Sequence, residues 1–304
     1  MLQDYAQIRE ILKGGKPPLI SVAVAQDREV IHTIKVACEE GLARAVFVGD
    51  REQIERIMGE EGISSPAPII HEPDEEAACR RSVQLVKTGE ADLLMKGLVN
   101  SSTFLRAVLR GEKDAGSKGF LSHLAVFQIP GYDRLFFTSD GGMNVAPGLA
   151  EKKQILINGV EALHSLGIQI PKVAILTANE KVDPKIPATT DAAALVKMWE
   201  DGEITGCLPE GPISMDVAMS REAAIHKGIV SRIAGEVDFF IAPNIEAGNM
   251  VGKALIYFVG AKMAGLILGA EYPIVMTSRA ENTEGKLNSI ALASVIARRE
   301  RNAL

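Results

Sequence analysis

The first part of the chain alternates short apolar runs with segments whose apolar residues recur every three or four positions. Runs rich in β-branched residues at 19–25, 45–49, 68–71 and 91–95 each predict a buried strand. The segments between them have the apolar spacing of amphipathic helices. This alternation predicts an α/β fold with a mostly parallel sheet covered by helices on both faces.

The pattern changes near Gly131. Two apolar runs, at 122–127 and 134–138, flank a glycine-containing turn and predict an antiparallel hairpin. A second α/β series follows, with strands predicted at 173–177 and 238–242. We therefore place a domain boundary near Gly131.

The stretch at 272–292 joins a predicted buried strand, 273–277, to a helix for which Thr283 is the predicted N-cap. Ser278 and Arg279 fall between the two. Strand-to-helix junctions are where α/β sheets bind ligands, and the free N–H groups of a helix N-terminus favour an anion. An ordinary loop whose arginine pairs with a surface carboxylate would give the same local pattern.

Other predicted junctions also carry polar or small residues. Lys96 and Gly97 follow the fourth strand, and Asn100 and Ser101 come next, where a serine would equally serve to cap a helix. Residues 210–216 predict a turn. Ser122, at the start of the predicted hairpin, is a further candidate ligand-binding residue. In the second half the candidates are Asp216, Glu246, Gly248 and Asn249, the last two at the start of a long apolar helix. We expect these junctions to meet around a large anionic ligand.

Composition narrows the classes of function. The net charge is −6 and no basic block occurs, which argues against a nucleic-acid partner. Three scattered cysteines do not form a disulfide framework and suit the reducing cytoplasm. The five histidines form no metal-ligand pair. No signal peptide is evident, and the apolar stretch at 254–270 is broken by Lys262 and glycines, so we expect no membrane span.

Four segments resemble the phosphate acetyl/butyryl transferase family. They are MKGLVNSS (95–102), EGPISMDVAMS (210–220), APNIEAGNMVGKAL (242–255) and PIVMTSRA (273–280). They occur in the family's order and spread over most of the chain, so they are specific together although each is weak alone. The sequences KIPATTDA (185–192) and AENTEGKLNSIALA (280–293) look closer to the butyryl branch than to the acetyl branch.

The resemblance implies a two-domain fold similar to that of isocitrate and isopropylmalate dehydrogenases, with mostly parallel sheets and an interdomain cleft. The first domain would comprise residues 1–131 plus 271–304, and the second 132–270. The implied reaction is butyryl-CoA + phosphate = butyryl phosphate + CoA, by direct transfer in a ternary complex. Coenzyme A is then a substrate, and no cofactor or metal is implied. The resemblance and the apolar 254–270 region both favour a homo-oligomer.

The implied chemistry fits the residues. The transition state gathers negative charge, which Arg279 would offset while Ser278 donates a hydrogen bond to the developing oxyanion. A base must take the CoA thiol proton. Acetyl-specific relatives carry an aspartate seven residues after the serine, but here that position is Gly285. We expect Glu284 to act instead, although a first-turn acid favoured by the helix dipole is the alternative explanation.

Three other functions remain as alternatives. A phosphate acetyltransferase acting on acetyl-CoA would share the same chemistry. A metal-dependent hydroxyacid dehydrogenase on the same fold would need clustered aspartates and a nicotinamide site, and the sequence has neither pattern. A non-catalytic acyl-CoA or acyl-phosphate sensor is disfavoured by the Ser278–Arg279 pair.

Overall fold

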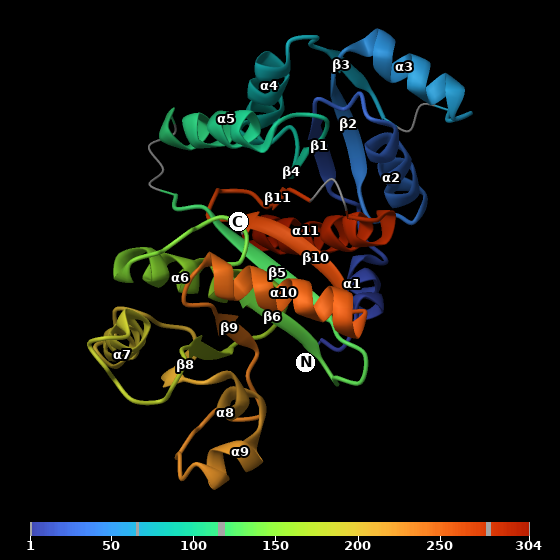
Figure 1. Ribbon diagram of the computed structural model, residues 1–304. Helices are drawn as coiled ribbons and strands as arrows, with labels where there is room; N and C mark the ends of the chain where they lie inside the picture. The colour runs from blue at the N-terminus through green and yellow to red at the C-terminus, as the bar shows by residue number, and fades with distance from the viewer. Residues whose placement is uncertain (1, 65–66, 115–118, 278–280, 304) are drawn as a thin grey trace. The chain divides into compact units, whose positions relative to one another are not determined.

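The computed structural model describes residues 2–64, 67–114, 119–277 and 281–303, which form two compact units (Figure 1). The terminal unit comprises Asp4–Gly119 and Ala264–Leu304, and the central unit comprises Met1–Gln3 and Phe120–Met263. The chain therefore leaves the terminal unit and returns to it. The division into domains near Gly131 and at residue 271 stays a prediction.

The sheet of the terminal unit has the strand order β3-β2-β1-β4-β11-β10. The strands are β1 (Leu19–Ala23), β2 (Arg44–Gly49), β3 (Ile69–His71), β4 (Leu93–Lys96), β10 (Lys262–Leu268) and β11 (Ile274–Val275). The first five in this order pair in parallel, and β10 is antiparallel to β11. The apolar runs predicted to be strands are therefore parallel neighbours, as expected. Strands β1, β2 and β4 are largely buried, but the burial predicted for β3 is wrong: its two isoleucines are half-buried and His71 is exposed, because β3 is the first strand in this order.

Within the described residues, the helices of this unit are α1 (Tyr5–Leu12), α2 (Arg28–Glu39), α3 (Arg51–Glu60), α4 (Glu75–Lys87), α5 (Ser101–Asp114) and α11 (Thr283–Ala303). The side chains of Asp27, Asp50 and Asp74 each accept a hydrogen bond from the first turn of α2, α3 and α4, which fixes where these helices begin. Helices α1 and α2 pack on α11, and α4 packs on α5 and β1.

The predicted N-cap of α11 is wrong by one residue. The helix begins at Thr283, but the side chain of Asn282 accepts the hydrogen bond from the N–H of Gly285, at 2.9 Å. Asparagine caps helices as well as threonine does, so the sequence alone did not separate the two positions.

The central unit has the strand order β5-β6-β9-β7-β8. Its strands are β5 (Ser122–Gln128), β6 (Leu135–Ser139), β7 (Lys172–Leu176), β8 (Leu208–Ile213) and β9 (Phe239–Ile241). Strands β5 and β6 form the predicted antiparallel hairpin, and β6, β9, β7 and β8 are parallel. The turn predicted at 210–216 is wrong for its first residues, which belong to β8; its proline is tolerated because β8 lies at the end of the strand order.

The helices of the central unit are α6 (Leu149–Ser165), α7 (Pro187–Glu200), α8 (Met215–Met219), α9 (Arg221–His226) and α10 (Ile245–Val259). One core joins α8, α9 and α10 to the sheet, where the rings of Phe136 and Phe240 stack with centroids 4.4 Å apart. The long apolar helix predicted after residue 242 is α10; it ends where Gly260 adopts a left-handed conformation, with φ of 71°. In the described part of the chain, no helix is long and apolar enough to cross a membrane.

Candidate functional site

In the terminal unit the turn after β4 is built onto the end of β1. The N–H of Gly97 donates to the carbonyl of Ala23, and the N–H of Leu98 donates to that of Val24, both at 2.8 Å. A Cβ on Gly97 would lie 2.3 Å from the Val24 oxygen, so only glycine fits here. Because β4 and β11 are parallel neighbours, this turn lies at the same sheet edge as the end of β11.

Lys96 turns its ammonium onto this loop. Its Nζ donates to the carbonyls of Gly97, at 3.1 Å, and Val99, at 3.0 Å, and the residue is 9% exposed. The side chains of Asn100 and Ser101, at the start of α5, are exposed at the same turn. The arrangement holds a buried positive charge at the strand end, and its role as a substrate ligand stays a prediction.

The catalytic pair expected at Ser278 and Arg279 lies outside the described residues. The chain is described again from Glu281, which precedes α11, and the predicted base Glu284 lies in the first turn of that helix. Glu284 is exposed, whereas Glu281 is half-buried. Two carboxylates therefore stand at the N-terminus of α11.

In the central unit the carboxyl ends of β6, β9, β7 and β8 share one edge because the four strands are parallel. Ser122 lies at that edge for a different reason from the one expected: it begins β5, which is antiparallel to β6. Its side chain is fully buried, and its Oγ accepts a hydrogen bond from Asn158 of α6 at 3.0 Å.

The loop after β6 is organised by Asp140, which is 2% exposed. Its carboxylate accepts hydrogen bonds from the N–H groups of His123, Gly142 and Met143 and from the side chain of Asn144, at 2.7–2.9 Å. Burial lowers the pKa of His123, against the opposing effect of the Asp140 charge. These bonds fix a glycine-rich loop at the sheet edge.

The N-terminus of α10 packs against this loop. A Cβ on Gly248 would lie 2.7 Å from the Cα of Gly141, and the side chain of Asn249 donates to the Gly141 carbonyl at 3.1 Å. Asn244 caps the helix, and Glu246 is an exposed acid in its first turn. The predicted residues Gly248 and Asn249 are thus brought to the glycine-rich loop, 108 positions away in the chain.

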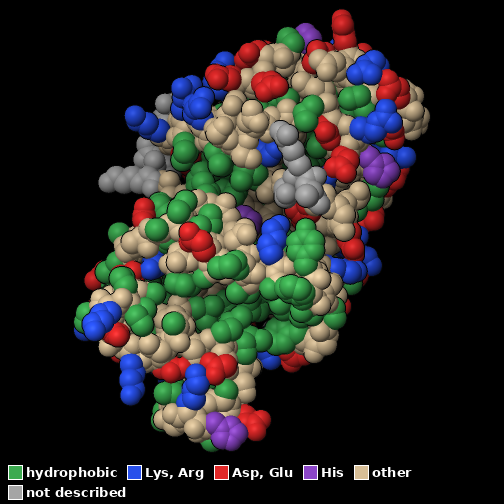
Figure 2. Space-filling view, in the orientation of Figure 1, with side chains coloured by type: hydrophobic (Ala, Val, Ile, Leu, Met, Phe, Trp, Pro, Cys, Tyr) green, Lys and Arg blue, Asp and Glu red, His purple; other side chains and the backbone are tan. Residues whose placement is uncertain are grey.

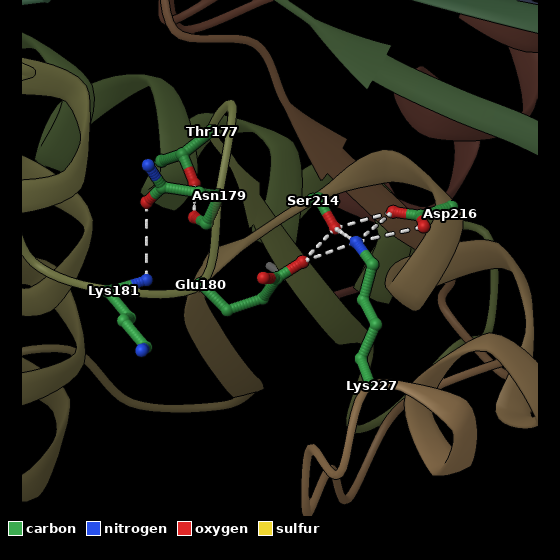
Figure 3. Close-up of polar contacts among 7 residues, drawn as sticks. All are labelled: Thr177, Asn179, Glu180, Lys181, Ser214, Asp216 and Lys227. Atoms are coloured by element: carbon green, nitrogen blue, oxygen red, sulfur yellow. Dashed lines mark hydrogen bonds and ion pairs between the residues drawn. The ribbon is translucent and has the colours of Figure 1, made fainter.

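A charged cluster lies where β7 and β8 end (Figure 3). Lys227, which follows α9, donates to Glu180 at 3.0 Å and to Asp216 at 3.0 Å, and to the hydroxyl of Ser214 at 3.2 Å. The Ser214 hydroxyl in turn lies within hydrogen-bond distance of both carboxylates. Three segments that are distant in sequence therefore meet around one ammonium group.

This cluster shifts the pKa of its members. Hydrogen bonds from Ser214 and Lys227 lower the pKa of Asp216 to about 2 and lower that of Glu180, and the two carboxylates raise the pKa of Lys227. The sequence predicted a site for Asp216 but not for Lys227 or Glu180. No spacing rule connects Glu180 in the loop after β7, Asp216 in α8 and Lys227 at the end of α9, so only the fold reveals the cluster.

Among the described residues, no group of three or more histidine, cysteine, aspartate or glutamate side chains is arranged to hold a metal ion.

Comparison with known proteins gives a consistent result. The model of the family described as phosphate acetyl/butaryl transferase matches residues 76–294. A phosphate butyryltransferase from Clostridium acetobutylicum is 43% identical over 98% of this chain and 99% of its own length. A phosphate acetyltransferase from Thermotoga maritima is 38% identical over 93% of this chain and 96% of its own length.

Solved structures agree on the fold. A branched-chain phosphotransacylase from Enterococcus faecalis superposes with a TM-score of 0.79 and 30% identity, covering 92% of this chain and 99% of that one. A 4-hydroxythreonine-4-phosphate dehydrogenase from Burkholderia phymatum, 13% identical, superposes with a TM-score of 0.62 over 93% of this chain and 99% of that one. The fold is therefore shared with a dehydrogenase, in line with the expected fold class.

Proposed function

Because the chain belongs to the phosphate acetyl/butaryl transferase family, we propose that it transfers a short-chain acyl group between coenzyme A and inorganic phosphate. Its reaction is butyryl-CoA + phosphate = butyryl phosphate + CoA. The observation that carries the proposal is the 43% identity to a phosphate butyryltransferase over almost the whole of both chains. The identity to the acetyltransferase is lower, at 38%, which favours butyryl over acetyl transfer.

The transfer is direct, in a ternary complex. Phosphate oxygen attacks the acyl carbon of the thioester, and the CoA sulfur leaves; in reverse, the thiolate attacks the acyl phosphate. Arg279 offsets the negative charge of the transition state and Ser278 donates to the oxyanion. The parallel pairing of β4 and β11 supports this, since it brings the Lys96 turn and the end of β11 to one edge.

In this proposal the substrate-binding residues of the central unit are those at the edge of its own sheet. We propose that an interdomain cleft presents this edge and the terminal-unit edge to one pair of substrates, and that closure of the cleft positions them for transfer. Asp216, Glu246, Gly248 and Asn249 would line the central side, with Ser122 behind them. The proposal is supported by the likeness to a dehydrogenase fold.

The CoA thiol must lose its proton before it attacks, and its ordinary pKa is near that of a free cysteine, about 8.5. A carboxylate at the N-terminus of α11 is the proton acceptor in this proposal. The sequence places Glu284 first for this role, and that assignment stays a prediction.

The decisive experiment measures thiol release from butyryl-CoA with and without inorganic phosphate. We expect release only when phosphate is present, with no effect of NAD or EDTA. A rate series over acetyl-, propionyl-, butyryl- and isobutyryl-CoA then ranks the acyl groups. Release that ignores phosphate, or binding without any release, would reject a transferase.

The protein also assembles as a homo-oligomer in this proposal. Helix α10 exposes a row of large apolar side chains: Met250 is 65% exposed, Tyr257 76% and Phe258 89%. Figure 2 shows hydrophobic side chains gathered where Figure 1 draws α10. A cluster of large, exposed apolar side chains usually marks a site of interaction with another molecule.

A further inference from the structure

The first turn of α11 is fixed to the sheet of the terminal unit. The Ser289 hydroxyl donates to the carbonyl of Gly285 at 2.9 Å and accepts from the N–H of Gly265, in β10, at 3.0 Å. Asn282 caps the same turn by accepting from the Gly285 N–H. The backbone around Gly285 is therefore held in place from both sides.

Glu281 folds its side chain over this fixed turn. A Cβ built on Gly285 would lie 2.5 Å from Glu281 Oε1, 2.8 Å from its Cγ and 3.1 Å from its Cδ. Contacts under 3.0 Å are not tolerated by real Cβ atoms, so a side chain at 285 and the present position of the Glu281 carboxylate exclude each other. Gly285 thus makes the space in which the carboxylate lies.

This position suits a negatively charged oxygen. It is at the N-terminus of a helix of 21 residues, where free N–H groups and the helix dipole stabilise an anion. Glu281 Oε1 is withdrawn from solvent, whereas the Glu284 side chain projects into it. The turn therefore holds one carboxylate in a partly buried place, whereas the other is exposed.

The charged and titratable groups described near this turn belong to α1, α2 and α11. Tyr5 of α1 is buried, and its pKa is raised by burial first and then by the Glu281 charge, which acts on it more strongly than Glu284 does. Lys286, on α11, is 4% exposed and forms an ion pair with Glu29 of α2. Its ammonium is therefore matched with Glu29.

We propose that Glu281, rather than Glu284, takes the proton of the CoA thiol. The inference rests on the proposed function, since it assigns a residue to that reaction. In the direction of acyl-CoA formation, the S–H bond breaks and its proton moves to a Glu281 oxygen. The thiolate forms a bond to the acyl carbon, and the bond from that carbon to the phosphate oxygen breaks. In the opposite direction Glu281 returns the proton to the departing sulfur.

The test follows thioester formation from butyryl phosphate and CoA across a pH range. In Glu281→Gln we expect kcat/KM to fall by about 100-fold at about pH 6.5, the size of effect expected for a lost general base. The loss should shrink toward about pH 9, because the thiol then ionises by itself. Glu52→Gln, an exposed first-turn acid of α3, is the matched control and should keep the wild-type profile.

Two further variants separate this role from a structural one. Gly285→Ala keeps the Glu281 carboxylate but displaces it, and should reproduce the loss at low pH. Gly285→Asp in a Glu281→Ala background returns a carboxylate to nearly the same place, and should regain about tenfold or more of the lost rate at low pH. Each variant is checked for folding by its thermal midpoint.

A Glu281→Gln enzyme with the wild-type pH profile overturns the inference, as does a loss at low pH found in Glu284→Gln but not in Glu281→Gln. Both results leave the transferase proposal standing, because wild-type activity is still seen. A wild-type protein without phosphate-dependent thiol release overturns both proposals together.

Discussion

The charge on a single carboxylate, Asp216, is set by its hydrogen bonds. Ser214 and Lys227 both contact it, and they hold its pKa at about 2 although the side chain is exposed. Its ordinary pKa is about 3.9. A pKa that is lower in the folded than in the unfolded chain means that the charged form stabilises the fold, and that this stabilisation is lost on protonation.

Asp216→Asn should therefore lower the thermal midpoint slightly at neutral pH, since exposed ion pairs contribute little. The difference from wild type is fully present above about pH 4 and should vanish as the pH falls toward about 2. Thermal melts between these values measure it. A difference that stays constant over that range would show that the carboxylate charge is not its cause.

The second prediction at the residue scale concerns Arg279. Arg279→Ala should reduce turnover by about 100-fold or more while the protein stays folded, because the proposed reaction would lose the positive charge that offsets the negative charge of its transition state. The measurement is phosphate-dependent thiol release, with circular dichroism as the control for folding. Near-normal turnover would remove Arg279 from the chemistry.

Between elements, the closest approach of α10 to the loop after β6 is made by two glycines. The backbones of Gly248 and Gly141 approach so closely that a Cβ at 248 would meet main-chain atoms, which cannot move aside as a flexible side chain can. This contact joins a predicted ligand-binding segment, that of Gly248 and Asn249, to the glycine-rich loop, so its integrity governs both packing and the candidate site.

Gly248→Ala should destabilise the protein by about 1–3 kcal/mol, the usual cost of overpacking. Gly59→Ala is its control: Gly59 lies in α3 with no atom within 4 Å of the added methyl, so the change should stabilise by about 0.5–1 kcal/mol through better helix propensity. Urea unfolding of both variants measures the change in the free energy of unfolding, which should be negative for Gly248→Ala and positive for Gly59→Ala. A stable Gly248→Ala protein would contradict the close approach.

At the scale of the whole molecule, the prediction concerns the proposed homo-oligomer, in which other copies of the chain would cover the apolar row on α10. Phe258→Asp places a charge on a side chain that is 89% exposed in the single chain but buried in the proposed assembly. We expect the solution mass to fall to that of one chain. Light scattering after size exclusion measures it, and Ile225→Asp, 70% exposed on α9, is the control. An unchanged mass would place the interface elsewhere.

The order of strands and helices and the hairpin are largely evident in the sequence, as is the position of the candidate residues at strand-to-helix junctions. The apolar periodicity of a strand or helix is a local property, because it depends on which side chains within that one segment must be buried. For that reason β1, β2, β5, β6 and α10 were expected, and β8 was missed because its proline and glycine carry no strand signal. The family could also be identified from the sequence, because the segments that resemble it are each continuous stretches of the chain.

Only the tertiary structure decided which carboxylates meet which partners. The Lys227 cluster joins the loop after β7, helix α8 and the end of α9. Lys96 donates hydrogen bonds to the carbonyls of Gly97 and Val99, and this depends on backbone directions that no spacing encodes. The same holds for Glu281 and Gly285, which the sequence shows only as an acid and a glycine four positions apart. In the folded helix, the Glu281 carboxylate lies in the space that a side chain at position 285 would occupy. Which side chains touch depends on how the folded backbone places their atoms, and residue spacing along the chain does not determine this.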